Sequence, residues 1–173
     1  MYEVELKIKV SSLEDVRLKL KSLGAELRWK GIQEDTYYSH PCRDFSQTDE
    51  AVRLRRTGDG SVELTYKGPR RSGDAKIRYE VNIPIDPDFE KDVRSFLEHI
   101  GFSKSFRIVK RREIYLWKNI CINLDFVEGL GPYVELELLS PHSFGDVFEE
   151  VIRRLNLRGE RTTRSYLELF INS

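Results

Sequence analysis

Acidic side chains at alternate positions of predicted strands are the residues in this chain best suited to chemistry. Side chains of a strand point alternately to its two faces, so the run YEVELKIKV gathers its charged residues on one face. The run YVELEL repeats the pattern, and LDF adds one more acid. The acids concerned are Glu3, Glu5, Asp125, Glu135 and Glu137.

Carboxylate oxygens without histidine or cysteine neighbours favour Mg²⁺ or Mn²⁺ over zinc. We therefore predict that these five acids form a site for a divalent metal ion. A single Glu-x-Glu pair is most often only the solvent-facing side of a strand. Two such pairs together with a strand aspartate favour the metal site over that interpretation.

Basic side chains occupy the same alternating positions in several predicted strands. They are Lys7, Arg53, Arg55, Lys67, Arg78, Lys110 and Arg112. Arginine binds phosphate oxygens through paired hydrogen bonds, and lysine binds them as a point charge. Any one of these bases alone would more often be a surface residue in a weak ion pair. Together with the acids they predict a lined cavity that binds a polyphosphate.

The overall charge limits the kinds of partner. Lys plus Arg total 29 and Asp plus Glu total 29, so no global field attracts a nucleic acid polymer or a membrane surface. The same balance argues against an RNA-binding barrel. The two cysteines form no CxxC pair, which favours a reducing, cytoplasmic location. We expect no signal peptide and no membrane span, because charges interrupt every apolar run.

The elements expected to position these residues are mostly strands. After the opening strand, strands are predicted over 27–38, 51–56, 62–67, 76–83, 106–117, 120–127 and 133–139. Helices are predicted from a capping box at Ser11 and Glu14 up to Gly24, over 88–100 and over 144–155, with a last helical turn in SYLELF. The loop SHPCRDFSQTDE is predicted to lack a continuous strand.

Eight strands in mostly hairpin order predict an α+β fold with one domain over residues 1–173. The strands form an antiparallel barrel whose closure removes exposed edges, and the helices cover its apolar outside. An eight-stranded barrel leaves room for side chains or one small ligand. Charges inside it must be matched by opposite charges, metal ions or bound anions, because unpaired buried ions cost several kcal/mol each.

The motifs in order resemble those of the CYTH, or triphosphate tunnel metalloenzyme, family. They are the opening Glu-x-Glu-x-Lys, the RLR of AVRLRR, TYKGP, the spaced bases of IVKRRE, and LDFVEGLGPYVELE. The resemblance spans nearly the whole chain and implies an eight-stranded tunnel. In that tunnel the acids hold Mg²⁺ or Mn²⁺, with Glu5, Asp125 and Glu137 as catalytic residues, and the bases hold a triphosphate.

Within that family, DTYYSHPCRDFSQTDEAVRLRR is most similar to the class IV adenylyl cyclases. His40, Arg43, Asp44 and Phe45 stand where their loop motif belongs, and Tyr166 lies in a closing segment, RSYLELF, like theirs. One departure is Asn82, where members often have an acid. It leaves Glu80 alone in its strand, and we rank Glu80 below the other acids.

The resemblance implies a metal-dependent phosphorus–oxygen lyase that converts ATP to cyclic AMP and pyrophosphate. The alternatives are a triphosphatase for inorganic triphosphate, thiamine triphosphate or a nucleoside triphosphate, and a protein that binds polyphosphate without turnover. The acid set favours catalysis, because an anion binder gains nothing from carboxylates beside phosphate unless metal intervenes. An apolar strand face or helix stripe leaves a homodimer open.

Overall fold

The computed structural model describes residues 2–71, 76–138 and 144–171. Within these ranges an antiparallel sheet of nine strands has the order β5-β4-β3-β2-β6-β7-β8-β1-β9. The strands are β1 (Tyr2–Lys9), β2 (Glu26–Ser39), β3 (Ala51–Thr57), β4 (Val62–Arg71), β5 (Lys76–Ile85), β6 (Ser103–Trp117), β7 (Ile120–Val127), β8 (Gly131–Leu138) and β9 (Arg161–Thr162). The helices are α1 (Leu13–Ser22), α2 (Phe45–Thr48), η1 (Pro87–Phe89), α3 (Glu90–His99), α4 (Phe144–Leu155) and α5 (Tyr166–Ile171).

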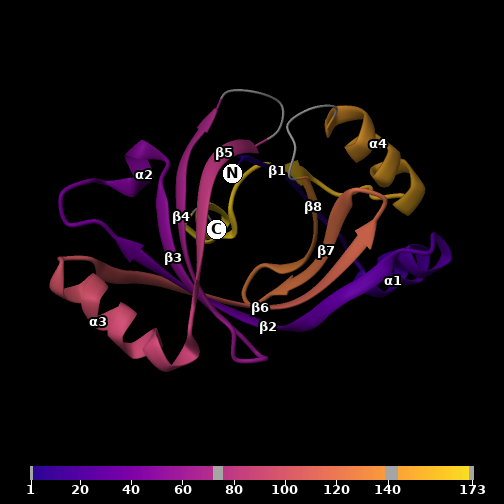
Figure 1. Ribbon diagram of the computed structural model, residues 1–173. Coiled ribbons are helices and arrows are strands. Elements are labelled where there is room, and N and C mark those ends of the chain that lie inside the picture. The colour runs from indigo at the N-terminus through magenta and orange to yellow at the C-terminus, as the bar shows by residue number, and fades with distance from the viewer. Residues whose placement is uncertain (1, 72–75, 139–143, 172–173) are drawn as a thin grey trace.

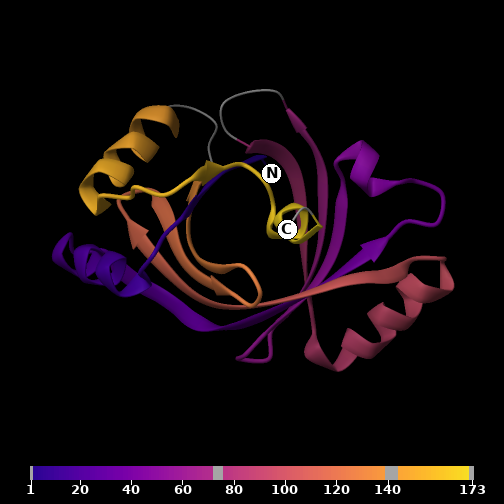
Figure 2. The same cartoon turned by 180° about the vertical axis from the view of Figure 1, so that it is seen from behind.

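The sheet closes on itself because β1 pairs on both sides. Residues 4–9 of β1 lie beside β8, and residues 2–5 also pair with residues 76–79 of β5. Figure 1 views the resulting ring of strands nearly end-on, with α5 inside its outline, and Figure 2 shows the same arrangement from behind. The predicted α+β fold with an antiparallel eight-stranded barrel is confirmed, and β9 adds a short unpredicted strand beside β1.

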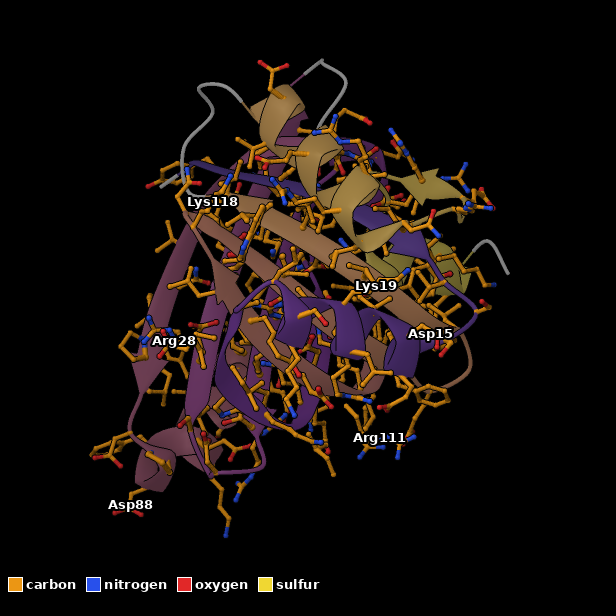
Figure 3. The ribbon with its side chains drawn as sticks, turned by 90° about the vertical axis from the view of Figure 1, so that its right-hand side faces the viewer. Asp15, Lys19, Arg28, Asp88, Arg111 and Lys118 are labelled. Carbon is orange, nitrogen blue, oxygen red and sulfur yellow. The ribbon has the colours of Figure 1, made fainter. Side chains whose placement is uncertain are left out.

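The apolar faces of β1, β7 and β8 point out of the ring towards α1 and α4. Val4 and Ile8 of β1 pack in one buried cluster with Leu20 of α1 and Leu155 of α4. Lys19 donates a hydrogen bond to the carbonyl oxygen of Leu155 at 2.8 Å, and Figure 3 shows α1 and α4 over the strands. Burying each such side chain contributes roughly 1.5–3 kcal/mol. With the apolar face outside, strand alternation directs the charged face inwards.

A second apolar cluster lies under α3. Leu97 of the helix packs with Tyr38 of β2, Leu54 of β3 and Val62 of β4, all of which are buried. Figure 1 shows α3 outside the ring, well separated from α1 and α4. The helices α1, α3 and α4 therefore cover the outside of the barrel, as predicted, whereas α5 lies within its outline. No helix among the described residues is long and apolar enough to cross a membrane.

Local hydrogen bonds explain where the helices differ from the predicted boundaries. Ser12, and not Ser11, caps α1, because its hydroxyl accepts from the backbone N–H of Asp15 at 3.2 Å. The segment predicted to be only a loop contains α2, which Asp44 caps by accepting from the backbone N–H of Ser46 at 2.9 Å. The closing segment forms α5, as predicted.

Strand β5 extends two residues beyond its predicted end. Pro84 does not end the strand, because at this residue β5 is paired with β4 on one side and is an edge strand on its other side, where proline is tolerated. β5 pairs with β1 over residues 76–79, well before this proline. Residue 139, the predicted end of the last long strand, lies outside the described residues.

Candidate active site

The interior of the ring holds a cavity of about 250 Å³ that is lined by charged side chains. They project from β1 to β6 and from β8, on the face opposite the apolar clusters. The candidate residues that line it are Glu5, Lys7, Arg53, Arg55, Lys67, Arg78, Glu80, Lys110, Arg112, Glu135, Glu137 and Tyr166. The structure thus brings together side chains that are up to 161 residues apart in sequence (5 to 166).

Lys7 lies between two carboxylates. Its Nζ atom is 3.1 Å from Oε1 of Glu5 and 3.0 Å from Oε2 of Glu135. Burial alone would lower the pKa of Lys7, but the charges of Glu135 and Glu5 outweigh burial and raise this pKa above its ordinary value. Lys7 therefore keeps its positive charge inside the barrel.

Arg112 forms the centre of a second buried network. Its Nε atom donates to Oδ1 of Asp125 at 2.6 Å, and its Nη2 atom donates to Oε1 of Glu135 at 2.7 Å. Asp125 is completely buried and stands behind Arg112, outside the set of residues that line the cavity. Burial would raise the pKa of Asp125, but the charges of Arg112 and Lys110 hold it below its usual range. In this arrangement the carboxylate of Asp125 orients the side chains of Arg112 and Lys110.

Lys110 has an environment unlike that of Lys7. Its Nζ atom is 3.5 Å from Oδ2 of Asp125, a carboxylate that Arg112 already binds. Burial and the neighbouring charge of Arg112 lower the pKa of Lys110 to about 7, against the opposing effect of Asp125. An added phosphate would favour the charged form of this lysine, so Lys110 is suited to gain its proton together with the anion.

Asp35 is a cavity residue that the sequence analysis missed. It is 3% exposed, and its oxygens accept from Nε and Nη2 of Arg55 at 2.6 and 2.7 Å. Nη1 of Arg53 lies 3.8 Å from the same carboxylate. Burial would raise the pKa of Asp35, but the charges of Arg55 and Arg53 lower it well below its ordinary value. Alternation of Gln33, Asp35 and Tyr37 along β2 was the signal that could have found it.

The remaining bases are held by acids on β5 and at the C-terminal end of α2. Lys67 on β4 contacts Glu80 on β5 at 2.7 Å, and both line the cavity. Nη2 of Arg78 donates to Oδ1 of Asp49 at 3.0 Å. Asn82, the departure from the family pattern, also faces the cavity, so Glu80 is the acid of β5 in this wall.

Two carboxylates are suited to a divalent cation. Glu5 and Glu137 are direct partners in the register of β1 and β8, and both line the cavity. Like charges placed opposite each other on paired strands repel unless a cation lies between them. Among the described residues, no three His, Cys, Asp or Glu side chains form a metal-binding group. Mg²⁺, however, commonly uses one or two carboxylates and completes its shell with substrate phosphates and water.

The other acids have different surroundings. Glu135 accepts from Arg112 and, at 3.2 Å, from Nδ2 of Asn123, in addition to its contact with Lys7. The same amide nitrogen donates to Oε2 of Glu137 at 3.2 Å. The backbone of Glu3 pairs with that of Arg78, whereas its side chain lies outside the described part of the chain. Glu5 and Glu137 are thus the acids whose placement best fits a metal ion.

A second cavity, of about 630 Å³, adjoins the charged one. The two share Tyr37, Ala51, Arg78 and Ser165 in their walls. The loop residues singled out in the sequence line this second cavity, namely His40, Arg43, Asp44 and Phe45. Aromatic rings of Tyr38 and Phe106 and apolar side chains of α5 also line it, together with the charged residues Asp49, Glu50, Arg70, Arg78 and Glu168. The adjoining cavity is therefore less charged than the interior of the ring and has space for the ring system of a small organic molecule.

Comparisons with known proteins agree with this geometry. A family model described as CYTH domain matches residues 1–166. The chain is 39% identical over 179 residues to "Putative adenylate cyclase MJ0240" of Methanocaldococcus jannaschii, with 98% of each chain covered. It is 27% identical to "Adenylate cyclase CyaB" of Aeromonas hydrophila, with 97% of this chain and 88% of that protein covered. The solved structure of PH1819 protein from Pyrococcus horikoshii OT3 has a TM-score of 0.86 at 38% identity, and 98% of each chain is covered.

Proposed function

The chain belongs to the CYTH family, and from this premise we propose that it is a class IV adenylyl cyclase that converts ATP to cyclic AMP and pyrophosphate. The observation that carries the proposal is the joint presence of buried bases and the facing Glu5 and Glu137 carboxylates in one cavity. The bases of this cavity would bind the negative charges of a triphosphate, and its two facing carboxylates would bind a divalent cation. The relatives named as adenylate cyclases support the choice among triphosphate reactions.

The bases are held in place by carboxylates before any substrate arrives. Asp35 fixes Arg55, and Asp125 with Glu135 fixes Arg112. A guanidinium has five N–H donors, so its binding to a carboxylate does not exhaust its capacity for phosphate oxygens. Preorganised donors in a site that excludes water stabilise developing charge without reorganisation during the reaction.

Glu5 and Glu137 would hold Mg²⁺ or Mn²⁺, which when bound polarises phosphoryl oxygens and lowers the pKa of a nearby hydroxyl. The bases orient the triphosphate so that the ribose 3′-oxygen lies in line with the α-phosphorus. A bond forms between these two atoms, the bond from the α-phosphorus to the bridging oxygen breaks, the proton of the 3′-hydroxyl passes to solvent, and pyrophosphate leaves. No side chain is required as a nucleophile, because positioning and electrostatics provide most of the catalysis in phosphoryl transfer.

The adjoining cavity favours a nucleoside triphosphate over bare triphosphate. Inorganic triphosphate would occupy the charged cavity alone, whereas ATP also has an adenosine to place. The 630 Å³ space beside Arg78, with the aromatic rings of Phe45 and Phe106 in its wall, matches the size and character of small-molecule sites. Adenosine in this cavity and phosphates in the ring would share Tyr37 and Arg78 at the junction.

The second candidate function is triphosphate hydrolysis. The charged cavity alone suffices for it, because a water in place of the ribose hydroxyl would attack the γ-phosphorus of a triphosphate held by the same residues. The two activities differ in where the nucleophile lies along one row of bases.

Product analysis separates the two. The protein is incubated with ATP, tripolyphosphate or thiamine triphosphate, with Mg²⁺ or Mn²⁺, and every product is identified by chromatography. Cyclic AMP with an equal amount of pyrophosphate supports the cyclase. Orthophosphate without cyclic AMP supports the triphosphatase, and binding without any product would contradict both.

A further inference from the structure

Tyr166, the first residue of α5, reaches into the charged cavity from the C-terminal segment. It is 5% exposed, and its hydroxyl donates to Oδ2 of Asp125 at 2.7 Å. The Nζ atom of Lys7 lies 5.2 Å from the centre of its ring, and the Nζ atom of Lys110 lies 5.0 Å from it. One aromatic ring thus contacts two ammonium groups from strands β1 and β6, which are not neighbours in the sheet.

The contacts give the ring a defined electrostatic task. The face of an aromatic ring attracts cations, and this attraction is greatest where the cation is desolvated. Lys7 and Lys110 are both 2% exposed, so water screens neither of them. Lys7 has two carboxylate partners, but Lys110 shares its carboxylate with Arg112. For Lys110 the ring is therefore a substantial part of what fixes the position of the ammonium group.

The surroundings of Tyr166 hold the ring in one orientation. The ring of Tyr133 packs edge-on against it, with centroids 5.5 Å apart and an interplanar angle of 72°. The start of α5 is fixed by Glu168, whose carboxylate accepts from the N–H of Ser165 at 2.7 Å and from Nη2 of Arg70 at 2.6 Å. The hydroxyl bond to Asp125 fixes the far end of the ring.

We propose that Tyr166 is a positioning residue for phosphate binding: its ring sets the places of the Lys7 and Lys110 ammonium groups, and its hydroxyl anchors that ring on Asp125. This inference rests on the proposed function, since it takes the two lysines as ligands of the substrate phosphates. It also makes the C-terminal segment part of the phosphate site, because the ring belongs to α5 and not to a barrel strand.

The test compares Tyr166→Phe, which keeps the ring, with Tyr166→Leu, which removes it. Binding of inorganic tripolyphosphate with Mg²⁺ is measured by calorimetry, KM and kcat are measured for ATP, and thermal unfolding reports the fold. We expect Tyr166→Leu to weaken tripolyphosphate binding and to raise KM about tenfold, because two cation–π contacts are lost. The tripolyphosphate affinity and the KM of Tyr166→Phe should stay within about threefold of the wild-type values, because this conservative variant keeps the ring.

Phe170→Leu is the matched control. Phe170 lies on the same helix, but its ring is directed towards Gly129. Its loss should lower the unfolding temperature without changing KM, as a merely structural role predicts. A folded Tyr166→Leu protein with wild-type tripolyphosphate affinity would overturn the inference, and so would an equal loss in the Phe and Leu variants. Failure of the wild type itself to bind or turn over any triphosphate would instead contradict the proposed function.

Discussion

Glu5 and Glu137 are direct register partners on β1 and β8, and both line the cavity inside the barrel. This arrangement of like charges is unfavourable unless a cation occupies the space between them. The neighbouring pair in the same register, Lys7 and Glu135, has opposite charges and forms an ion pair at 3.0 Å. We therefore propose different tasks for the two adjacent pairs: Glu5 and Glu137 would bind a cation, whereas Glu135 fixes the base Lys7.

Changing Glu137 to Gln tests the metal assignment. We expect turnover with Mg²⁺ or Mn²⁺ to fall at least 100-fold and the half-saturating metal concentration to rise, because one of two carboxylate ligands is lost. Thermal stability without metal should stay the same or increase, since repulsion with Glu5 is relieved. The control is Glu149→Gln, the same substitution at an exposed residue of α4. Unchanged metal dependence in Glu137→Gln would remove this residue from the site.

Changing Asp35 to Asn tests whether the cavity bases depend on their acids. Arg55 would lose the charged partner of its two hydrogen bonds, whereas Arg53 keeps its contacts with Glu63 and Thr65. Breaking a buried ion pair by removing one partner costs on the order of 3–5 kcal/mol. Denaturant unfolding should therefore show a loss of up to this size, together with a higher KM for ATP. Glu34→Gln, at the preceding residue of β2, affects a pair with the exposed Arg107 and should cost less than about 1 kcal/mol. Equal losses of stability in Asp35→Asn and Glu34→Gln would contradict the prediction that the cavity bases depend on their buried acid.

At the scale of elements, α1 is attached to the outside of the barrel by a carboxylate on β6. Glu113 accepts from Nε of Arg17 at 2.9 Å and from the hydroxyl of Tyr115 at 3.0 Å, and Nζ of Lys30 lies 3.1 Å away. Burial would raise the pKa of Glu113, but the hydrogen bond from Arg17, with those from Lys30 and Tyr115, lowers it from 4.5 to about 2. This attachment belongs to the fold and not to the site, because Glu113 points away from the cavity.

The stabilisation by Glu113 should depend on pH in a defined window. A carboxyl with a lower pKa in the folded state stabilises the fold above its unfolded pKa and loses this effect as pH falls through its folded pKa. Wild type should therefore exceed Glu113→Gln by on the order of 2 kcal/mol above pH 4.5, and the difference should vanish near pH 2. Urea unfolding across this range measures it. Glu14→Gln, at the exposed second partner of Arg17, should show little difference at any pH.

At the scale of the whole molecule, the pattern of the sequence predicted the direction of side chains better than their depth. Alternation correctly placed Glu5 and Lys110 inside the ring, because apolar neighbours bury the opposite face of each strand. Alternation does not reveal that Asp125 stands behind Arg112, since depth depends on the length of the side chain in front. Asp35 was missed because the DTYY run was used only as a motif of the family resemblance and its alternating positions were not assigned to the two faces of a strand.

The strand pairs that close the barrel could not be derived from local pattern alone. The pairing of residues 2–5 with residues 76–79 joins segments that are far apart in sequence, and no hairpin connects them. Hairpin order predicts the neighbours β3-β4 and β6-β7, whereas β2-β6 and β1-β5 depend on which edges meet after the sheet curves. The expectation that closure removes exposed edges predicted a barrel, and the family resemblance implied the same tunnel, but neither identified these pairs or their register.

The ring also predicts how substrate affects stability. The cavity bases come from strands on all sides, so a triphosphate that contacts them links β1, β3 and β6 through one molecule. A ligand at 100 times its Kd stabilises the folded state by about 2.7 kcal/mol, which for a chain of this length raises Tm by roughly 5–10 °C. Tripolyphosphate with Mg²⁺ should give this rise in a thermal scan. Sulfate at equal ionic strength should give much less, because a net charge of zero provides no global attraction for anions. An equal rise with both anions would show that general salt effects, and not the assembled cavity, stabilise the barrel.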